Sequence, residues 1–362
     1  MSSGQRRFVG RPVADVHGRR SDVPLAHPDP TALQLADWLT PSFYIDFGRP
    51  CNSACLYCAV PPHEDAQGFL PPHDIPAIVA AGRAALCDRA ILIGGEPTIY
   101  PHLDAAFTAL RDAFAGAPGA AEVAARHIVM TNGLRLADPG ALDHLHAGGV
   151  ATLHISIDTL DSATYDRLSR SHGRLDRQLA GFDAALRDGR FHVYDYVATS
   201  RVNAPTLPAL LAGLAARAER LRLSAPPPVV FAVVKPIGDG LRHADDLVIE
   251  PAASADLVRA LLAEADRRGV PAVFRNVQAC LAPEIVHRNV DYYLDDFSVD
   301  VATGQRVAYS HTEYWCKPDS CARCGHDGVC TGVYRALAER VGMEAFLPLG
   351  REGLVAVSSG GV

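Results

Sequence analysis

The sequence contains no long apolar run, no long basic run and no apolar segment near its start. No apolar stretch approaches the roughly 20 residues that a membrane-spanning helix needs, and residues 1–20 are polar and Arg-rich, unlike a signal peptide. Basic runs do not extend beyond short clusters such as Arg6-Arg7 and Arg19-Arg20, and the formal net charge is -7. We therefore expect a cytoplasmic protein that binds neither a membrane nor nucleic acid.

A complete disulfide framework is also disfavoured, because the chain has nine cysteines, an odd number. A cytoplasmic protein keeps its thiols reduced, so this many cysteines in 362 residues indicates metal ligands. The composition, with 48% hydrophobic and 21% charged residues, is that of a globular chain that buries a large core.

Short apolar runs alternate with helical patterns from Ser42 onward. The runs predicted as strands are Phe43 to Phe47, Ala90 to Ile93, Ile128 to Thr131, Ala151 to Ile157, Tyr194 to Thr199 and Val229 to Lys235. The predicted helices are Ile75 to Cys87, Leu103 to Phe114, Gly140 to His146, Leu175 to Leu186, Pro205 to Leu221 and Ala252 to Arg268. Parallel strands need such crossovers, so we expect an α/β fold, a partial (β/α)6 TIM-like barrel.

Three regions are predicted along the chain. Residues 1–41 lack periodicity and form an N-terminal arm, and residues 42–269 form the barrel. Residues 270–362 carry five of the nine cysteines and one clear helix, Gly332 to Arg340, as expected of a small cysteine-rich C-terminal domain held by metal. In barrels of this kind ligands bind at the carboxyl ends of the strands, so we expect the chemistry there.

Three cysteines follow the first predicted strand in the segment Cys51-Asn52-Ser53-Ala54-Cys55-Leu56-Tyr57-Cys58. Three thiolates on one loop can hold three irons of a [4Fe-4S] cubane and leave the fourth iron open for another ligand. A zinc ion normally takes a fourth protein ligand. The nearest candidate, His63, follows Pro61-Pro62, which limits its reach back. We therefore assign Cys51, Cys55 and Cys58 to a [4Fe-4S] cluster.

This loop resembles the cluster motif of the radical S-adenosylmethionine (SAM) superfamily, Cys-x3-Cys-x2-Cys with an aromatic residue before the last cysteine, here Tyr57. The resemblance extends over roughly residues 43 to 235. It implies that SAM is bound and cleaved reductively, giving a 5'-deoxyadenosyl radical that abstracts a substrate hydrogen. It also implies an electron donor such as flavodoxin or ferredoxin and a lumen poor in water.

Later segments resemble the superfamily's SAM-binding segments and occur in the expected order. Glycines in the turn Gly94-Gly95-Glu96 would let a backbone carbonyl approach the ammonium of SAM, while Glu96 supplies a compensating charge. On this resemblance the SAM-binding residues are Tyr57, Gly94, Gly95, Glu96, Thr131, Asn132, Ser156, Asp158 and Arg170.

The roles of Ser156, Asp158 and Arg170 in binding SAM need separate statements. Ser156 would bind the cofactor's hydroxyls or carboxylate, with Asp158 assisting it. Arg170 lies where relatives place a basic residue against the methionine carboxylate, but Arg167 and Arg174 are near enough to take that role. The same arginines also fit a solvated helix face.

Four further cysteines, Cys316, Cys321, Cys324 and Cys330, lie within fifteen residues near the C-terminus. The last three resemble the auxiliary-cluster segment of the SPASM and twitch subfamilies of radical SAM enzymes. The full SPASM pattern has another cysteine where this chain has Tyr334, so we expect one auxiliary [4Fe-4S] cluster and not two. A structural zinc ion is the alternative, because four thiolates suit it equally.

The remaining two cysteines differ in their surroundings. Cys87 lies on the apolar face of a predicted helix and is expected in the core. Cys280 follows a possible final strand, Ala272 to Val277, near the expected meeting point of barrel and auxiliary domain. Cys280 is open to three roles: an auxiliary ligand, a catalytic hydrogen-atom donor to a substrate radical, or a core residue.

Several reactions remain open on the sequence. We favour oxidation, by dehydrogenation or crosslinking, of a peptide or small natural product, with the auxiliary cluster as electron acceptor. Epimerisation, with Cys280 as hydrogen donor, is the alternative. Residues 156 to 185 also resemble GTP 3',8-cyclases, although the cyclase spacing of the second cysteine set and its Gly-Arg-Gly-Gly tail are absent. A non-catalytic iron-sulfur or zinc sensor would explain the cysteines but not the Gly94 turn and the Ser156 strand.

Overall fold

The structure, a computed structural model, describes residues 7–12, 42–59, 68–115, 126–292, 294–299, 306–308, 315–317, 319–325, 330 and 332–346. Its centre is a parallel sheet of seven strands: β2 (Ser42–Asp46), β3 (Arg89–Ile93), β4 (His127–Thr131), β5 (Val150–Ile155), β6 (His192–Thr199), β7 (Val229–Val233) and β8 (Ala272–Arg275). These strands pair in the order in which they occur in the chain. The predicted partial barrel is therefore confirmed.

The sheet has one parallel strand more than the six barrel units predicted, at the place where the sequence offered a final strand, Ala272 to Val277. Strand β8 pairs in parallel with β7, with Ala272 opposite Val229. The barrel sheet thus continues past residue 269, where we expected the barrel to end. The expected helix Ala252 to Arg268 is the crossover that makes this pairing possible, because it returns the chain to the edge of the sheet at which the parallel strands begin.

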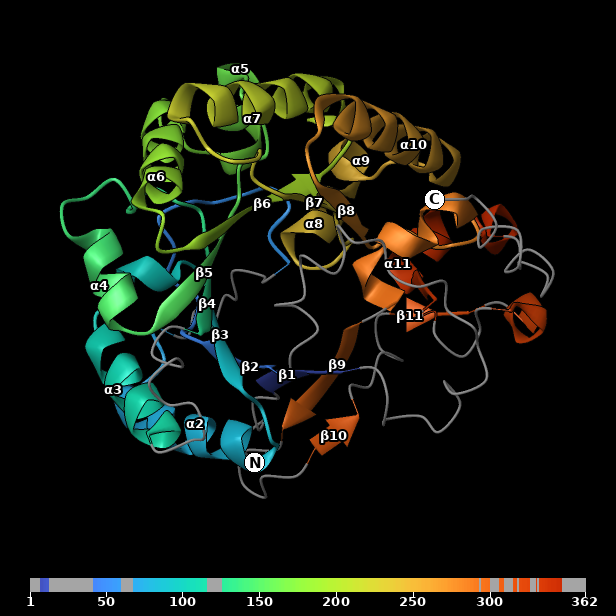
Figure 1. The fold of residues 1–362 in the computed structure, drawn as a ribbon. Helices are drawn as coiled ribbons and strands as arrows, with labels where there is room; N and C mark the ends of the chain where they lie inside the picture. Colours follow the sequence, from blue (N-terminus) through green and yellow to red (C-terminus); the bar gives the residue numbers. More distant parts are fainter. Residues whose placement is uncertain are drawn as a thin grey trace.

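The helices that connect the parallel strands cover the outside of the barrel (Figure 1). The longer of them are α2 (Ile75–Ala84), α3 (Leu103–Phe114), α4 (Ala141–Ala147), α5 (Ser162–Ser169), α6 (Leu175–Asp188), α7 (Leu207–Leu221) and α10 (Pro251–Arg268). Helix α5 was not predicted, because only Tyr165 and Leu168 give it a buried apolar face. It begins where the Asp161 side chain accepts a hydrogen bond from the Thr164 amide at 2.8 Å.

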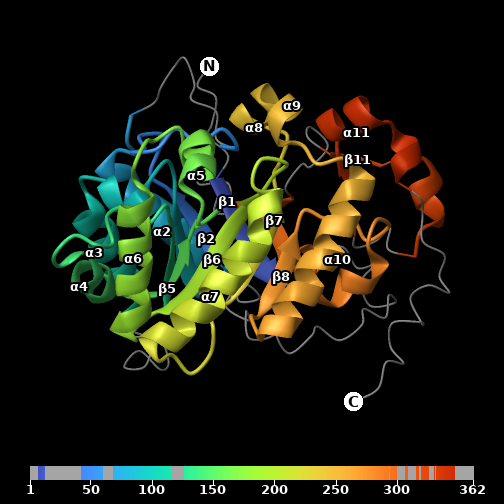
Figure 2. The same ribbon diagram turned by 90° about the horizontal axis from the view of Figure 1, so that it is seen from above.

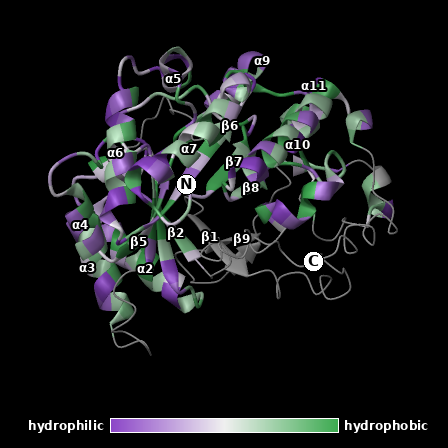
Figure 3. Ribbon diagram, turned by 45° about the horizontal axis from the view of Figure 1, so that its top comes forward, coloured by the Kyte–Doolittle hydropathy of each residue, from purple (hydrophilic) through white to green (hydrophobic). Residues whose placement is uncertain are grey.

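The strands bury both faces, as the alternation of β6 shows. Val193 and Val197 pack in the large core between sheet and helices. Tyr194 and Tyr196 alternate with them and belong to a separate cluster with Val230 on β7 and with Val273 and Val290. This second cluster lies on the lumen side of the sheet, because neighbouring residues of a strand point to opposite faces. Figure 3 shows the mixed polar and apolar faces of the surrounding helices.

Three antiparallel strands continue the sheet beyond β2. Strand β1 (Arg7–Pro12) lies between β2 and β9 (Leu294–Val299), and β10 (Arg306–Ala308) pairs with the other edge of β9. Residues 7–12 thus form a strand within the segment predicted as an arm. The rest of that arm lies outside the described residues.

The C-terminal region contains a two-stranded antiparallel sheet of β11 (Trp315–Cys316) and β12 (Val333–Tyr334), followed by α11 (Arg335–Val341). Two short helices, α8 (Asp239–Arg242) and α9 (Ala244–Leu247), follow β7 and lie at the same end of the barrel as α5 and α11 (Figure 2). The short 3-10 helices are η3 (Pro72–Asp74), η4 (Pro97–Ile99), η5 (Ala204–Thr206), η6 (Pro283–Arg288), η7 (Val290–Tyr292), η9 (Asp319–Arg323) and η10 (Met343–Ala345). Within the described part of the chain, no helix has the length and apolarity required to cross a bilayer.

Candidate active site

The three-cysteine loop, residues 51–58, lies at the carboxyl end of β2, where the sequence placed it. The end of α5 holds it through two backbone hydrogen bonds, from the Ala54 amide to the Ser169 carbonyl at 3.1 Å and from the Leu56 amide to the Leu168 carbonyl at 2.8 Å. The Cys58 carbonyl accepts a bond from the Asp239 amide of α8 at 3.0 Å. Helices that follow β5 and β7 therefore fix a loop that follows β2.

The glycine turn after β3 packs directly on the entrance to the cysteine loop. The Gly95 amide donates to the Gly48 carbonyl at 2.7 Å, and the Glu96 amide donates to the Pro50 carbonyl at 3.0 Å. A Cβ atom on Gly95 would lie 2.2 Å from the Pro50 carbonyl oxygen. Gly94 has a φ of +144°, a conformation that favours glycine. These glycines are thus required for contact between the two loops, in addition to the approach to SAM that their sequence predicts.

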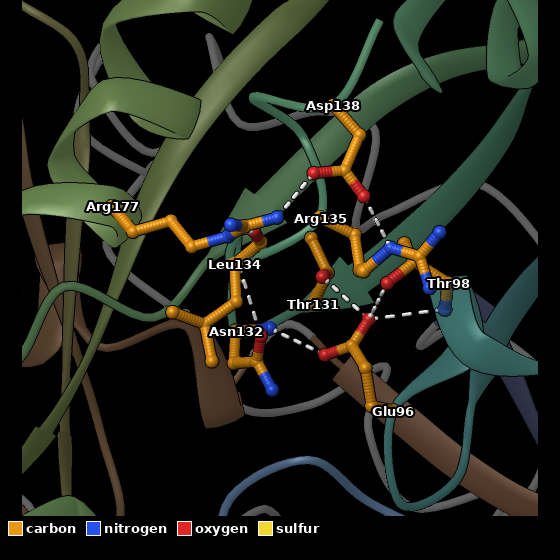
Figure 4. Close-up of polar contacts among 8 residues, drawn as sticks. All are labelled: Glu96, Thr98, Thr131, Asn132, Leu134, Arg135, Asp138 and Arg177. Carbon is orange, nitrogen blue, oxygen red and sulfur yellow. Dashed lines mark hydrogen bonds and ion pairs between the residues drawn. The ribbon is translucent and has the colours of Figure 1, made fainter. Parts of the chain in front are cut away.

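The Glu96 carboxylate joins the β3 and β4 turns (Figure 4). Its Oε1 accepts bonds from the Thr98 amide at 3.0 Å, the Thr98 hydroxyl at 2.6 Å and the Thr131 hydroxyl at 2.6 Å, and its Oε2 accepts from the Asn132 amide at 2.8 Å. The side chain is buried. Glu96 therefore places a negative charge at the predicted position, but protein donors already occupy much of its hydrogen-bonding capacity.

Amide side chains join the end of β4 to the cysteine loop on one side and to the end of β5 on the other. The Asn132 Nδ2 donates to the Asn52 Oδ1 at 2.6 Å, which links the end of β4 to the residue after Cys51. The Gln178 Nε2 of α6 donates to the main-chain oxygens of Asn132 at 2.8 Å and Ser156 at 2.9 Å. The half-buried Ser156 hydroxyl has no partner among the described residues, so it can bind a ligand.

The arginines that compete for the carboxylate role differ in their partners. Arg167 forms an ion pair with Asp246 at 3.0 Å, and Arg174 donates to the Asn52 carbonyl at 2.8 Å. Arg170 is exposed and has no hydrogen bond or ion pair among the described residues. It ends α5 in the left-handed conformation, with a φ of 52°. Arg170 is thus the one of the three whose guanidinium is available to an anion.

Tyr57 and Asp158, both assigned to SAM on the sequence, contact each other. The Tyr57 hydroxyl donates to the Asp158 Oδ2, and the Ala198 amide donates to the Oδ1 at 2.7 Å. Burial raises the pKa of Asp158 to about 6, against the opposing effect of these two hydrogen bonds. Both carboxylate oxygens of Asp158 are therefore engaged by the protein itself.

The thiols of the loop fit a cluster in their chemistry and placement. Cys51 is exposed, and Cys55 and Cys58 are half-buried. Burial raises the pKa of Cys55, and the nearby Asp158 carboxylate raises it further. Three thiolates suit three irons of a cubane, whereas a structural zinc ion normally takes four protein ligands.

Cys280 lies with the C-terminal cysteines. It packs with Cys316 against Val333, Ala338 and Phe346. Burial raises the pKa of Cys280 to about 12, and the neighbouring thiols of Cys330, Cys321 and Cys324 add to this effect. The Gln278 Nε2 donates to the Gly332 carbonyl at 3.3 Å, which joins the end of β8 to the segment after Cys330. This placement favours the ligand or core role of Cys280 over that of a lumen donor. Cys87 is fully buried, so its predicted core position is confirmed.

Several residues that build the site were not identified from the sequence. They are Asn52, Gln178, Ala198, Asn203 and Asp239. Only Asn52 carried a local signal, since it lies between two predicted ligands. The others come from α6, β6, α8 and, for Asn203, the residue before η5, and they act through hydrogen bonds between separate elements, which depend on how the fold brings those elements together.

Comparisons with known proteins agree with this geometry. Residues 45–203 match the family model described as the radical SAM superfamily. Among curated proteins, GTP 3',8-cyclase 1 of Pseudomonas aeruginosa is 32% identical over 225 residues, covering 59% of this chain and 59% of that protein. A probable GTP 3',8-cyclase of Methanopyrus kandleri is 28% identical over 200 residues, covering 54% and 58%. The chain therefore spans less than two thirds of the length of these relatives.

Among solved structures, Streptococcus suis SuiB bound to S-adenosylmethionine superposes with a TM-score of 0.57 and 13% sequence identity, covering 89% of this chain and 80% of SuiB. SuiB bound to its precursor peptide SuiA gives a TM-score of 0.56 with 13% identity. At this identity the likeness concerns the fold, and it extends over both the barrel and the C-terminal region.

Proposed function

Because this chain belongs to the radical SAM superfamily through its barrel, we propose that it is an oxidising radical SAM enzyme with an auxiliary [4Fe-4S] cluster. When bound, a cubane with one open iron supplies the electron that cleaves SAM to methionine and a 5'-deoxyadenosyl radical. The observation that carries the proposal is the loop of Cys51, Cys55 and Cys58, which two backbone hydrogen bonds join to the glycine turn of β3.

The groups around this loop support SAM as the ligand. The free Ser156 hydroxyl and the unpaired Arg170 guanidinium both lie after β5, on the side of the barrel where α5 meets the cysteine loop. A serine hydroxyl can both donate and accept hydrogen bonds, as binding of a ribose requires. A free guanidinium can bind the carboxylate of the methionine part of SAM. We assign these two residues, with the Gly94 to Glu96 turn, to the cofactor.

The C-terminal cysteines support oxidation as the reaction. Removal of a hydrogen atom leaves a substrate radical, and its conversion to a closed-shell product two hydrogens lighter requires that one further electron and one proton leave, the proton to solvent. Cys316, Cys321, Cys324 and Cys330 are candidates to hold a cluster that accepts this electron, which would then return to a flavodoxin or ferredoxin. The substrate is proposed to be a peptide or small natural product, consistent with the peptide bound by SuiB, whose fold this chain shares.

The test is SAM cleavage by anaerobically reconstituted protein that has been reduced with dithionite. We expect 5'-deoxyadenosine from the wild type and at least a hundredfold less from the variant in which Cys51, Cys55 and Cys58 are all replaced by Ala. Cys87→Ala is the matched control, because it removes a buried thiol away from the loop. If the triple variant cleaves SAM at the wild-type rate, the assignment is wrong. A wild type that binds iron without cleaving SAM would indicate a sensor instead.

Epimerisation remains the alternative reaction for the same site. It would require Cys280 to give a hydrogen atom to the substrate radical, since a thiol S-H bond is weaker than most C-H bonds. Cys280→Ala then loses product formation, and the wild-type product keeps the mass of the substrate while gaining solvent deuterium. Under the proposed oxidation, the product is instead two hydrogens lighter than the substrate or crosslinked.

A second candidate function is GTP 3',8-cyclisation, which the 32% identity to the Pseudomonas aeruginosa cyclase favours. Incubation of the reduced enzyme with GTP and SAM tests it directly. A cyclised GTP product would replace the oxidation proposal, whereas unchanged GTP with continued SAM cleavage would retain it.

A further inference from the structure

Tyr57 occupies an unusual position in the cysteine loop, because it lies between two predicted cluster ligands, Cys55 and Cys58, and its hydroxyl contacts a buried carboxylate. The hydroxyl donates a hydrogen bond to the Asp158 Oδ2. Cys55 and Tyr57 are two residues apart, so the same turn presents both groups to Asp158.

Two further hydrogen bonds hold Asp158 in this contact. Its Oδ1 accepts from the Ala198 amide at 2.7 Å, and its main-chain oxygen accepts from the Asn203 Nδ2 at 2.8 Å. The same Nδ2 also donates to the Ala198 carbonyl at 3.0 Å. The carboxylate is thus held between the ends of β5 and β6, with only 7% of the residue exposed.

The surroundings of the pair are apolar, which strengthens its electrostatic effect. Leu56, Tyr57 and Ala198 pack against a cluster that includes Leu168 and Val234. Exclusion of water lowers the local dielectric constant, so a charge there acts more strongly on its neighbours than it would at the surface.

We propose that the Tyr57 and Asp158 pair sets the reduction potential of the cluster held by Cys51, Cys55 and Cys58. This inference rests on the proposed function. One-electron reduction adds negative charge to the cluster and its thiolates, and the Asp158 carboxylate opposes that charge. The hydrogen bond from the Tyr57 hydroxyl draws electron density from the carboxylate. It therefore weakens the unfavourable effect of the Asp158 charge on reduction of the cluster. Both residues therefore act on the cluster through its surroundings and not as ligands.

Substitutions at the two positions are expected to move the potential in opposite directions. Asp158→Asn removes the charge and raises the midpoint potential. Tyr57→Phe removes the donor and lowers the potential when the titration is run well above the pKa of Asp158, where the carboxylate stays ionised. We expect about a tenfold change in the equilibrium constant of one-electron reduction in each case, equivalent to about 59 mV. Tyr100→Phe is the matched control, since that buried hydroxyl bonds to the Leu70 carbonyl at 2.7 Å.

The measurement is an anaerobic redox titration with dithionite, followed by electron paramagnetic resonance. The cluster signal that changes on addition of SAM identifies the cluster of the cysteine loop. Iron content and the dissociation constant of SAM are measured on each variant. Midpoint potentials that shift in opposite directions in the two variants, at wild-type iron content, support the inference. If Asp158→Asn loses its iron, the shift in the potential of Tyr57→Phe alone supports it.

Two results would overturn the inference while leaving the proposed function intact. One is a pair of variants with the wild-type potential, or with shifts of the same sign. The other is an unchanged potential with weakened SAM binding in Asp158→Asn, which would assign Asp158 to the cofactor. Failure of the proposed function gives a different result, since the wild type itself would then show no signal that responds to SAM.

Discussion

At the scale of single residues, burial in the barrel core changes the pKa of the ionisable side chain of His127. Its ring is buried at the start of β4, and its Nδ1 accepts a hydrogen bond from the Ala90 amide at 3.2 Å. The ring also makes an edge contact with Phe114, with centroids 5.4 Å apart. Burial lowers the pKa of His127 to about 3, with smaller contributions from Arg126 and Arg89. The ring is therefore neutral in the folded protein at every ordinary pH.

This burial predicts a dependence of stability on pH. Below its ordinary pKa of 6.5, His127 takes up a proton in the unfolded chain but not in the folded one. The free energy of unfolding should thus fall as the pH drops from 6.5 towards 3, by up to about 1.4 kcal/mol per pH unit from this residue. Urea unfolding at several pH values measures it. His127→Asn should remove this part of the slope, whereas His73→Asn, at an exposed site, should not. Equal slopes in all three proteins would contradict the prediction.

At the scale of elements, the contact between the β3 turn and the cysteine loop is backbone against backbone. A Cβ on Gly95 would lie 2.2 Å from the Pro50 oxygen and 2.4 Å from the Arg49 oxygen, and neither atom can rotate away. The cysteine loop would have to move as a unit. Its hydrogen bonds to the end of α5 would then be strained as well.

We therefore expect Gly95→Ala to lose most of the iron of the loop cluster, with SAM cleavage falling in proportion. Gly68→Ala is the control, because a Cβ at that position has open space around it. Iron analysis and circular dichroism of both variants measure cluster loss separately from unfolding. Normal iron content in Gly95→Ala would show that the loop tolerates the displacement.

The elements themselves differed in how well their sequences predicted them. Strands β2 to β7 have apolar runs bounded by turns, and all six were predicted at nearly their observed positions. Strand β8 is only four residues long and was offered as a final strand but not as part of the barrel, and β1, which has no periodic pattern, was not predicted. The cysteine positions were visible because their spacing is local. The Tyr57 to Asp158 contact was not, since it joins residues 101 positions apart and depends on how β5 packs beside the loop.

At the scale of the whole molecule, the barrel and the C-terminal region are joined by side chains as well as by the chain. Arg340 of α11 contacts Asp245 of α9 at 2.5 Å, and α9 follows the helix that holds Cys58. This is a surface ion pair and contributes little to stability. It does join α11 to α9, and α8, α9 and α11 lie at the same end of the protein (Figure 2).

The proposal of two clusters predicts the metal content of the whole chain. We expect about eight irons per chain after anaerobic reconstitution, as two cubanes require. Replacement of Cys321 and Cys324 by Ala should reduce this to about four and leave SAM-dependent signals in place. Metal analysis by mass spectrometry measures both numbers. About four irons with one zinc in the wild type would instead assign the C-terminal cysteines to structural zinc.

Strand β1 has a consequence for the order in which this protein is completed on the ribosome. Arg7 pairs with Val299, and Val9 pairs with both Phe297 and Phe43. One edge of β1 can pair with β2 early, but its other edge must wait for β9, which follows much later in the chain. At typical rates of synthesis, roughly 5–20 residues per second, that delay is on the order of tens of seconds. During this interval the edge of β1 that later pairs with β9 is open, and open edges attract other chains. We expect the yield of soluble protein to depend on chaperones during this interval more than on the stability of the finished barrel.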